Sequence, residues 1–216
     1  MGWFDLNLSD SVRPSFRAEK LTECTLPITL VLLEGGVVGV IAAKVYQVSP
    51  LVLAVITAAP MFANLSSFAW NRIAAGRAKV QLACLLQAAV LLCVLAVALA
   101  PINDVGALIL VASMMISRVL VAGLITIRSV IWSLNYARSN RAQATGQLQM
   151  IASLVTVVIA SAVGPFLDQY PDGLSLLYAV GTAVGLLGIV FFRRVSVIGE
   201  NDHLLQEREA LNQRRQ

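Results

Sequence analysis

Residues 30–40 read LVLLEGGVVGV, and Glu34 is the only charged residue between Leu26 and Ala43. The surrounding stretch, 26–46, is long enough to cross a bilayer as a helix, which needs about 20 mostly apolar residues. A carboxylate at the bilayer centre costs roughly 2.5–3.5 kcal/mol on an insertion scale, so its presence calls for compensation. The fold and the role of Glu34 both depend on whether this stretch spans a membrane and on what lies at the same depth.

The composition indicates that it does. The chain has 216 residues, of which 58% are hydrophobic and only 13% are charged, whereas soluble domains carry about 25% charged residues. Further apolar stretches of spanning length cover 51–70, 80–100, 106–127, 146–167 and 174–192. The sequence therefore predicts an all-α membrane protein with six transmembrane helices in one domain, 26–194, between a polar N-terminal segment, 1–25, and a polar tail, 195–216.

The placement of Lys and Arg predicts the orientation of these spans. Fourteen of the 16 basic residues fall in the N-terminal segment, the second and fourth connections and the tail, and Lys44 alone falls on the other side. Because cytoplasmic loops carry the excess of positive charge, both termini are expected in the cytoplasm of a multi-pass protein of the cytoplasmic (inner) membrane. The basic residues behind the net charge of +4 thus lie in the segments at the cytoplasmic ends of the spans. No nucleic-acid partner is therefore expected.

Only Glu34 and Arg118 are ionisable residues placed well inside predicted spans. Each lies about nine residues from the cytoplasmic end of its span, so both should sit about 13 Å deep. One hypothesis is that the two charges face a central pathway and couple proton and substrate movement; the alternative is a static ion pair that fixes helix register. Asn64 and Gln87 are candidates for lining the same pathway, or for plain hydrogen bonds between helices.

Small residues four apart predict close helix packing, because they let membrane helices approach each other. Such pairs are Gly35 and Gly39 in the first span and Gly181 and Gly185 in the sixth. Packing faces are the favoured interpretation of these pairs, and helix packing or gating is predicted for Gly35, Gly39, Gly123, Gly164 and Pro165.

Three motifs resemble the N-terminal half of a major facilitator superfamily transporter. The loop SFAWNRIAAGRAK, 67–79, is similar to the family signature Gly-x-x-x-Asp-Arg followed by Gly-Arg-Lys/Arg, with matches at Arg72, Gly76, Arg77 and Lys79 and with Asn71 in place of the acid. In the fourth span, ISRVLVAGL resembles a second motif through Arg118 and Gly123. In the fifth, ASAVGPFLD resembles the Gly-x-x-x-Gly-Pro motif through Gly164 and Pro165.

The resemblance implies a six-helix half made of two inverted three-helix repeats. It also implies a secondary active transporter that moves a small-molecule substrate by alternating access and couples it to protons through Arg118. The asparagine at position 71 removes the acid from which the family builds a gating salt bridge.

The family normally has twelve spans, and the tail resembles the cytoplasmic linker between the two halves. The expected partner, besides the lipid bilayer, is a second six-helix half or a second copy of the chain. The chain is then half of a split or longer transporter, a half-size transporter that dimerises, or an assembly subunit that transports nothing.

The residue patterns argue against a membrane enzyme. Asp172-Gly173 is not followed by the acid cluster of phosphatidyl-alcohol transferases, and the sequence has no Gly-x-Ser-x-Gly or His-Glu-x-x-His motif. The three cysteines and the single histidine have no metal-ligand spacing. No catalytic residue, cofactor or metal is therefore expected.

Overall fold

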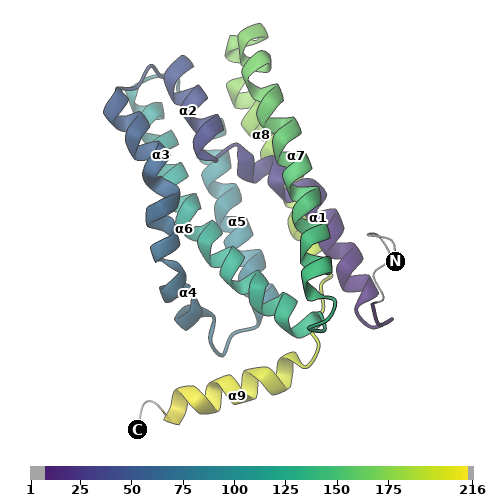
Figure 1. Cartoon of the computed structure of the whole chain (residues 1–216). Helices are drawn as coiled ribbons and strands as arrows, with labels where there is room; N and C mark the ends of the chain where they lie inside the picture. Colours follow the sequence, from purple (N-terminus) through teal and green to yellow (C-terminus); the bar gives the residue numbers. More distant parts are fainter. Residues whose placement is uncertain (1–7, 214–216) are drawn as a thin grey trace.

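The structure is a computed structural model, which describes residues 8–213, and every element in that range is helical. The helices are α1 (Arg13–Val31), α2 (Gly35–Lys44), α3 (Pro50–Leu65), α4 (Ser67–Ala74), α5 (Lys79–Ala98), α6 (Asp104–Asn135), α7 (Arg141–Gln169), the short 3-10 helix η1 (Pro171–Gly173), α8 (Leu174–Phe192) and α9 (Glu200–Gln213). Figure 1 shows α1 to α8 side by side, with α9 across one end of them.

Five segments are long and apolar enough to cross a membrane, and a sixth joins them if α3 and α4, which meet at a bend of 42°, form one span. The first segment runs from Arg13 to Lys44 and combines α1 with α2. These segments match the six predicted stretches in order, so the all-helical, multi-pass part of the prediction is confirmed at this level.

The bounds differ from the predicted ones mainly at one end of the molecule. The first helix begins at Arg13 instead of residue 26, α6 continues to Asn135 instead of 127, and α7 begins at Arg141 instead of 146. Hydropathy ended these spans early because the added turns contain charged residues such as Glu19 and Arg128. Inside the protein those residues pair with each other, so the helices continue through them.

Each long helix packs on several others. The α5 helix lies against α6 and α8, α1 lies against α7 and α8, and α3 and α4 lie against α6. The largest buried apolar cluster joins α2, α3, α5 and α6 to the facing ends of α7 and α8, and a second cluster joins α1, α5, α6 and α8. By contrast, α7 is the least buried of the spanning segments.

The contact between α1 and α8 depends on small residues. A Cβ built on Gly181 would lie 2.4 Å from Leu32 Cδ1, and one on Gly185 would lie 2.4 Å from Thr29 Oγ1. The Thr29 hydroxyl donates a hydrogen bond of 2.6 Å to the Gly181 carbonyl across the same contact. The predicted packing role of these two glycines is therefore confirmed.

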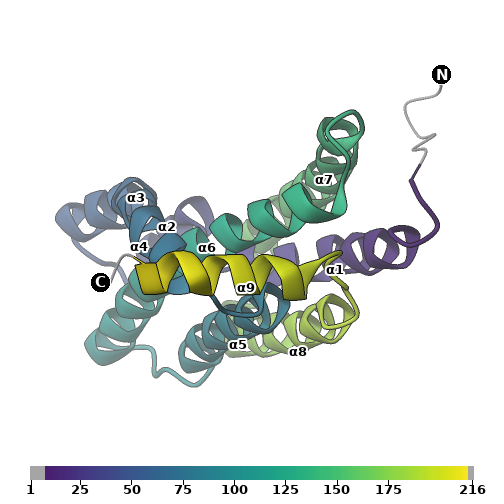
Figure 2. The ribbon, with the colours of Figure 1, turned by 90° about the horizontal axis from the view of Figure 1, so that it is seen from below.

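Helix α9 lies across the end of the helix set where α4, α5 and α6 meet their loops, which Figure 2 shows from below. We call this end of the molecule the α9 end. The α4–α5 loop and the loop that leads from α8 into α9 lie there, and the start of α1 is joined to that second loop through a hydrogen bond between the Ser15 and Ser196 hydroxyls.

Candidate functional site: a charged pocket beside a broken helix

The quoted stretch LVLLEGGVVGV does not form a continuous helix. Helix α1 ends at Val31, Glu34 has an extended backbone (φ −89°, ψ 139°), and α2 begins at Gly35. The last turn is tight, with the amides of Leu32, Leu33 and Glu34 donating to carbonyls three residues back. Two consecutive glycines follow, and glycine costs about 1 kcal/mol relative to alanine inside a helix. The expectation of one unbroken helix over 26–46 is therefore wrong at residues 32–34.

Side chains from two other spans satisfy the carbonyl groups that the break leaves open. The Tyr178 hydroxyl of α8 donates a hydrogen bond of 2.7 Å to the Leu32 carbonyl, and Arg118 Nη2 of α6 donates one of 2.9 Å to the Leu33 carbonyl. A backbone group without a partner costs several kcal/mol in hydrocarbon, which explains why a broken span carries such partners.

Glu34 and Arg118, which the sequence predicted at equal depth, do lie together. Arg118 Nη1 is 3.9 Å from Glu34 Oε1, which makes an ion pair but is too long for a hydrogen bond. The Arg118 side chain is 15% exposed and that of Glu34 is 50% exposed. The proximity supports the predicted pairing, while the coupling role assigned to it stays a prediction.

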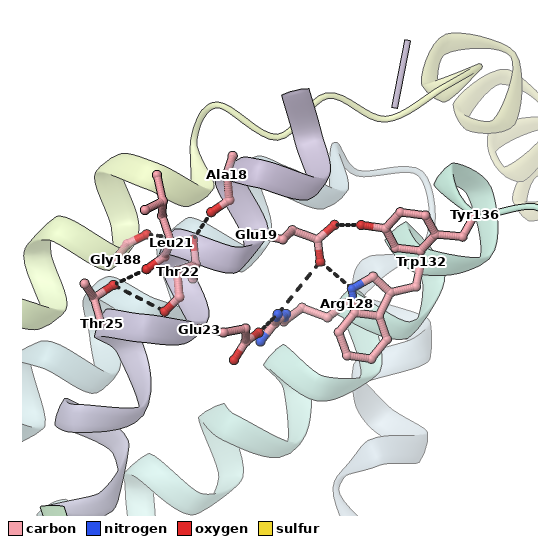
Figure 3. A network of polar contacts seen from close by, with 10 residues as sticks. All are labelled: Ala18, Glu19, Leu21, Thr22, Glu23, Thr25, Arg128, Trp132, Tyr136 and Gly188. Atoms are coloured by element: carbon pink, nitrogen blue, oxygen red, sulfur yellow. Dashed lines mark hydrogen bonds and ion pairs between the residues drawn. The ribbon is translucent and has the colours of Figure 1, made fainter. Parts of the chain in front are cut away.

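A second charged group, which sequence reasoning missed, joins α1 to α6 (Figure 3). Glu19 is fully buried and accepts hydrogen bonds from Tyr136 Oη and Trp132 Nε1. Arg128 donates to Glu23 and lies 3.9 Å from Glu19. We call Glu19, Glu23, Arg128, Trp132 and Tyr136 the buried cluster. Its carboxylates and its guanidinium compensate one another inside the protein.

The sequence does contain a signal for this cluster. Glu19 and Glu23 are four residues apart, as are Arg128, Trp132 and Tyr136 in turn, so each set lies on one face of its helix. A search for opposite charges at helical spacing on two neighbouring segments would have found it. Hydropathy alone does not reveal this signal, because it assigns residues 1–25 and 128–145 to polar segments outside the spans.

Between the two charged groups lies a pocket of about 260 Å³. It is lined by Glu23, Pro27 and Leu30 of α1, Leu33 and Glu34 of the break, Val90 of α5, Ser117, Arg118, Val121, Leu124, Ile125 and Arg128 of α6, and Gln149, Ala152 and Thr156 of α7. Ligand pockets usually measure about 300–1,000 Å³, so this one is large enough for a small solute only.

The two other predicted pathway residues lie elsewhere. Asn64 is exposed on α3, and Gln87 is fully buried in α5. Within residues 8–213, neither amide atom of Gln87 has a hydrogen-bond partner. Neither residue lines the charged pocket, so the prediction of a shared pathway finds no support there.

The predicted signature loop binds α9. Gly76 has a left-handed backbone (φ +71°) that favours glycine, and its N–H donates to Glu207 Oε2 at 2.7 Å. Lys79, which is buried, donates from Nζ to the same oxygen at 2.6 Å, and its backbone N–H donates to Glu200. We call the contact of Gly76 and Lys79 with Glu200 and Glu207 the α9 clamp.

The remaining signature residues lie outside the clamp. Asn71 and Arg77 are exposed, and Arg72 lies over the Phe68 ring at 4.6 Å.

The α9 clamp changes the titration of Glu207. Partial burial by itself raises the pKa of the Glu207 carboxyl. The hydrogen bonds from Lys79 and the Gly76 amide, with the charges of Lys79 and His203, outweigh burial and hold that pKa below its usual value of 4.5. Glu207 is therefore ionised at neutral pH, which keeps the buried Lys79 compensated.

The predicted packing residues divide into two groups. A Cβ on Gly123 would lie 2.6 Å from the Trp70 ring, so this glycine allows α4 to approach α6. A Cβ on Gly39 or Gly164 would meet no atom within 4 Å in the part of the chain that the structure describes. For Gly39, Gly164 and the neighbouring Pro165 of α7, a packing role stays a prediction that would need a partner surface. The same holds for Gly35, whose surroundings the structure does not describe.

Comparisons of the chain with protein-family models, curated proteins and solved structures find no match. The resemblance to a major facilitator half therefore stays a prediction, and the functional argument depends on the geometry of the site.

Proposed function

We propose that the chain is a six-span unit of a secondary active transporter, which moves a small solute across the cytoplasmic membrane. The observation that carries the proposal is the charged pocket, where Glu23, Glu34, Arg118 and Arg128 face one small hollow among otherwise apolar helices. Ionisable side chains inside spanning segments are expensive and are found mainly along substrate or ion pathways. Apolar residues would hold the helices together at lower cost, so a pocket of this kind favours a solute site over a packing contact.

The packing of the spans supports the half-transporter architecture. Numbered in chain order, span 1 contains α1 and α2, span 2 contains α3 and α4, and α5 to α8 are spans 3 to 6. In the five most extensive contacts between spans, span 1 packs on spans 5 and 6, span 4 packs on spans 2 and 3, and spans 3 and 6 pack on each other. If span 1 is exchanged with span 4, span 2 with span 5 and span 3 with span 6, the same set of contacts results. Each exchange joins spans of opposite direction, as two inverted three-helix repeats require.

The distribution of charge supports a cytoplasmic position for the α9 end. Arg72, Arg77, Arg138 and Arg141 flank the helix ends there, whereas Lys44 is at the far end, where it pairs with Asp168 at 2.6 Å. By the positive-inside rule this distribution favours a cytoplasmic position for α9 and the start of α1.

The pocket suggests where a partner would bind. One wall belongs to α7, the least buried spanning segment, and Gln149 of that wall is exposed. Transporters of this architecture place their substrate between two six-helix halves. We therefore expect a second half, or a second copy of the chain, to cover the open side of the pocket and complete the pathway.

Uptake by the purified chain in liposomes tests the proposal. Labelled solutes should accumulate when a pH gradient is imposed, either with the chain alone or after a six-span partner is added. Glu34→Gln should remove the dependence on the gradient, whereas Asp168→Asn, which removes an exposed carboxylate at the far end, should not. An assembly subunit would instead form a stable membrane complex and show no uptake under either condition, which would refute the transport proposal.

A further inference from the structure

We propose that the charged pocket binds a small zwitterion with a short aliphatic side chain, as in a neutral α-amino acid. The inference names a substrate class and so rests on the proposed function. Its basis is a set of polar groups that face the pocket and lack full partners inside the protein.

The arginines supply donors that still need an acceptor. A guanidinium has five N–H donors, and in the described residues Arg118 uses one on the Leu33 carbonyl. The Nε atoms of Arg118 and Arg128 are both buried and have no partner among residues 8–213. Both side chains line the pocket. A ligand carboxylate would fit this need, because its two oxygens can accept a pair of bonds from one guanidinium.

Glu34 is an acceptor that needs a cationic donor. Half of its side chain is exposed, and the nearest cationic atom is the Arg118 nitrogen at 3.9 Å, beyond hydrogen-bond distance. A ligand ammonium group would give this carboxylate the short, charged hydrogen bonds that no group in residues 8–213 gives it. Because Glu34 and Arg118 are neighbours, one ligand that satisfies both must carry its two charges close together, as an α-amino acid does.

The charge balance argues against a simple anion, and the free arginine donors argue against a simple amine. Two carboxylates and two guanidiniums line the pocket, which makes the lining neutral, and Glu19 behind it makes the five groups negative by one charge. An anion would therefore add uncompensated negative charge to a poorly solvated site. A simple amine would leave the remaining Arg118 donors without an acceptor, whereas a zwitterion offers a carboxylate to Arg118 and an ammonium to Glu34 and adds no net charge.

The remaining lining indicates the size and nature of the side chain. Apolar residues dominate it, namely Leu30, Leu33, Val90, Val121, Leu124 and Ile125. A volume of about 260 Å³ leaves room for a few carbon atoms beyond the charged groups. Burying them is favourable by about 25 cal/mol per Å², so an aliphatic amino acid should bind better than glycine.

Isothermal titration of the full chain in detergent tests the inference with three probes of matched shape: leucine, isopentylamine and isocaproate. Leucine should bind at least about tenfold more tightly than either singly charged analogue, the difference expected for one charged hydrogen-bonded contact. Equal affinity of the amine or the carboxylate for the chain would overturn the inference, and so would the absence of binding heat with all three probes.

Variants locate the site within the molecule. Arg118→Gln and Glu34→Gln should each weaken leucine binding about tenfold or more. Arg118→Lys keeps the charge but loses Nε and should fall between them and the unchanged chain. Lys44→Gln and Asp168→Asn break an exposed ion pair at the far end and should leave leucine affinity unchanged. Unaltered affinity in both pocket variants would overturn the inference.

The two proposals fail in different ways. Leucine binding without uptake, even with a partner half present, would refute transport and leave the zwitterion site intact. Uptake of another solute by a chain that does not bind leucine would do the reverse.

Discussion

Glu19 and Glu34 are both carboxylates of the first spanning segment, yet their surroundings differ in every respect that matters for function. Glu19 is fully buried and receives hydrogen bonds from Tyr136 and Trp132, with Arg128 close by. Glu34 is half exposed, stands at a break in the helix and has one loose partner, Arg118. A charge with its partners complete holds helices together, whereas a charge with its partners incomplete is available to a ligand.

The largest effect should come from removing the only cation of the buried cluster. Arg128→Leu would leave Glu19 and Glu23 buried without their guanidinium, and breaking a buried pair from one side costs about 3–5 kcal/mol. We expect a large fall in the thermal unfolding midpoint of the detergent-solubilised chain, with Arg138→Leu as a control in a loop. A midpoint equal to that of the unchanged chain would show that the buried cluster is not structural.

A single hydrogen bond to the buried carboxylate should matter less. Tyr136→Phe removes the donor to Glu19 Oε1 and keeps the ring that packs against Phe16. The loss should be about 1–3 kcal/mol, the usual cost of leaving a buried group without its partner. Denaturant unfolding measures it, with Tyr170→Phe as the matched exposed control. Equal losses for the two variants would count against a special role for Tyr136.

The corresponding change in the pocket should barely affect stability. In Glu34→Gln the lost ion pair is long and its carboxylate is half exposed, and such pairs contribute about 0–1 kcal/mol, while Arg118 keeps its hydrogen bond to the Leu33 carbonyl. The same unfolding measurement should therefore separate Glu34→Gln from Arg128→Leu by several kcal/mol. Similar losses for the two would erase the difference between the pocket and the buried cluster.

The smallest effect on the spans should come from the α9 clamp. The pKa of Glu207 is lower in the folded protein than its usual 4.5. Its contribution to docking is therefore complete above pH 4.5 and is lost as the pH falls through the folded value. Proteolysis of the α8–α9 loop should accelerate only in that acidic range, without a change in the midpoint of the spans. Glu207→Gln should show the fast cleavage at neutral pH as well, and a rate independent of pH in the unchanged chain would contradict the clamp.

The sequence predicted the positions of the long apolar helices well, because their length and hydropathy are visible in the sequence directly. It also placed Glu34 and Arg118 at one depth, since helical rise converts residue number into distance. It could not predict the break at residues 32–34, because the break depends on Tyr178 and Arg118 reaching the freed carbonyls from two other spans. A search limited to apolar stretches likewise cannot find the buried cluster, whose charged side chains compensate one another inside the protein.

The glycines that were predicted to pack show the same limit of sequence-based prediction. Gly181 and Gly185 sit where another helix approaches, while Gly39 and Gly164 face open space in the described chain. Spacing alone cannot distinguish the two cases, because each pair obeys the same four-residue rule. Only the packing partner decides which glycines are needed.

The most direct test of the difference between the pocket and the buried cluster is one experiment on Glu34→Gln, in which leucine binding and thermal unfolding are measured on the same preparation. We predict that leucine affinity falls about tenfold or more while the unfolding midpoint stays close to that of the unchanged chain. A midpoint lowered as far as in Arg128→Leu, with leucine affinity retained by the folded fraction, would contradict the account.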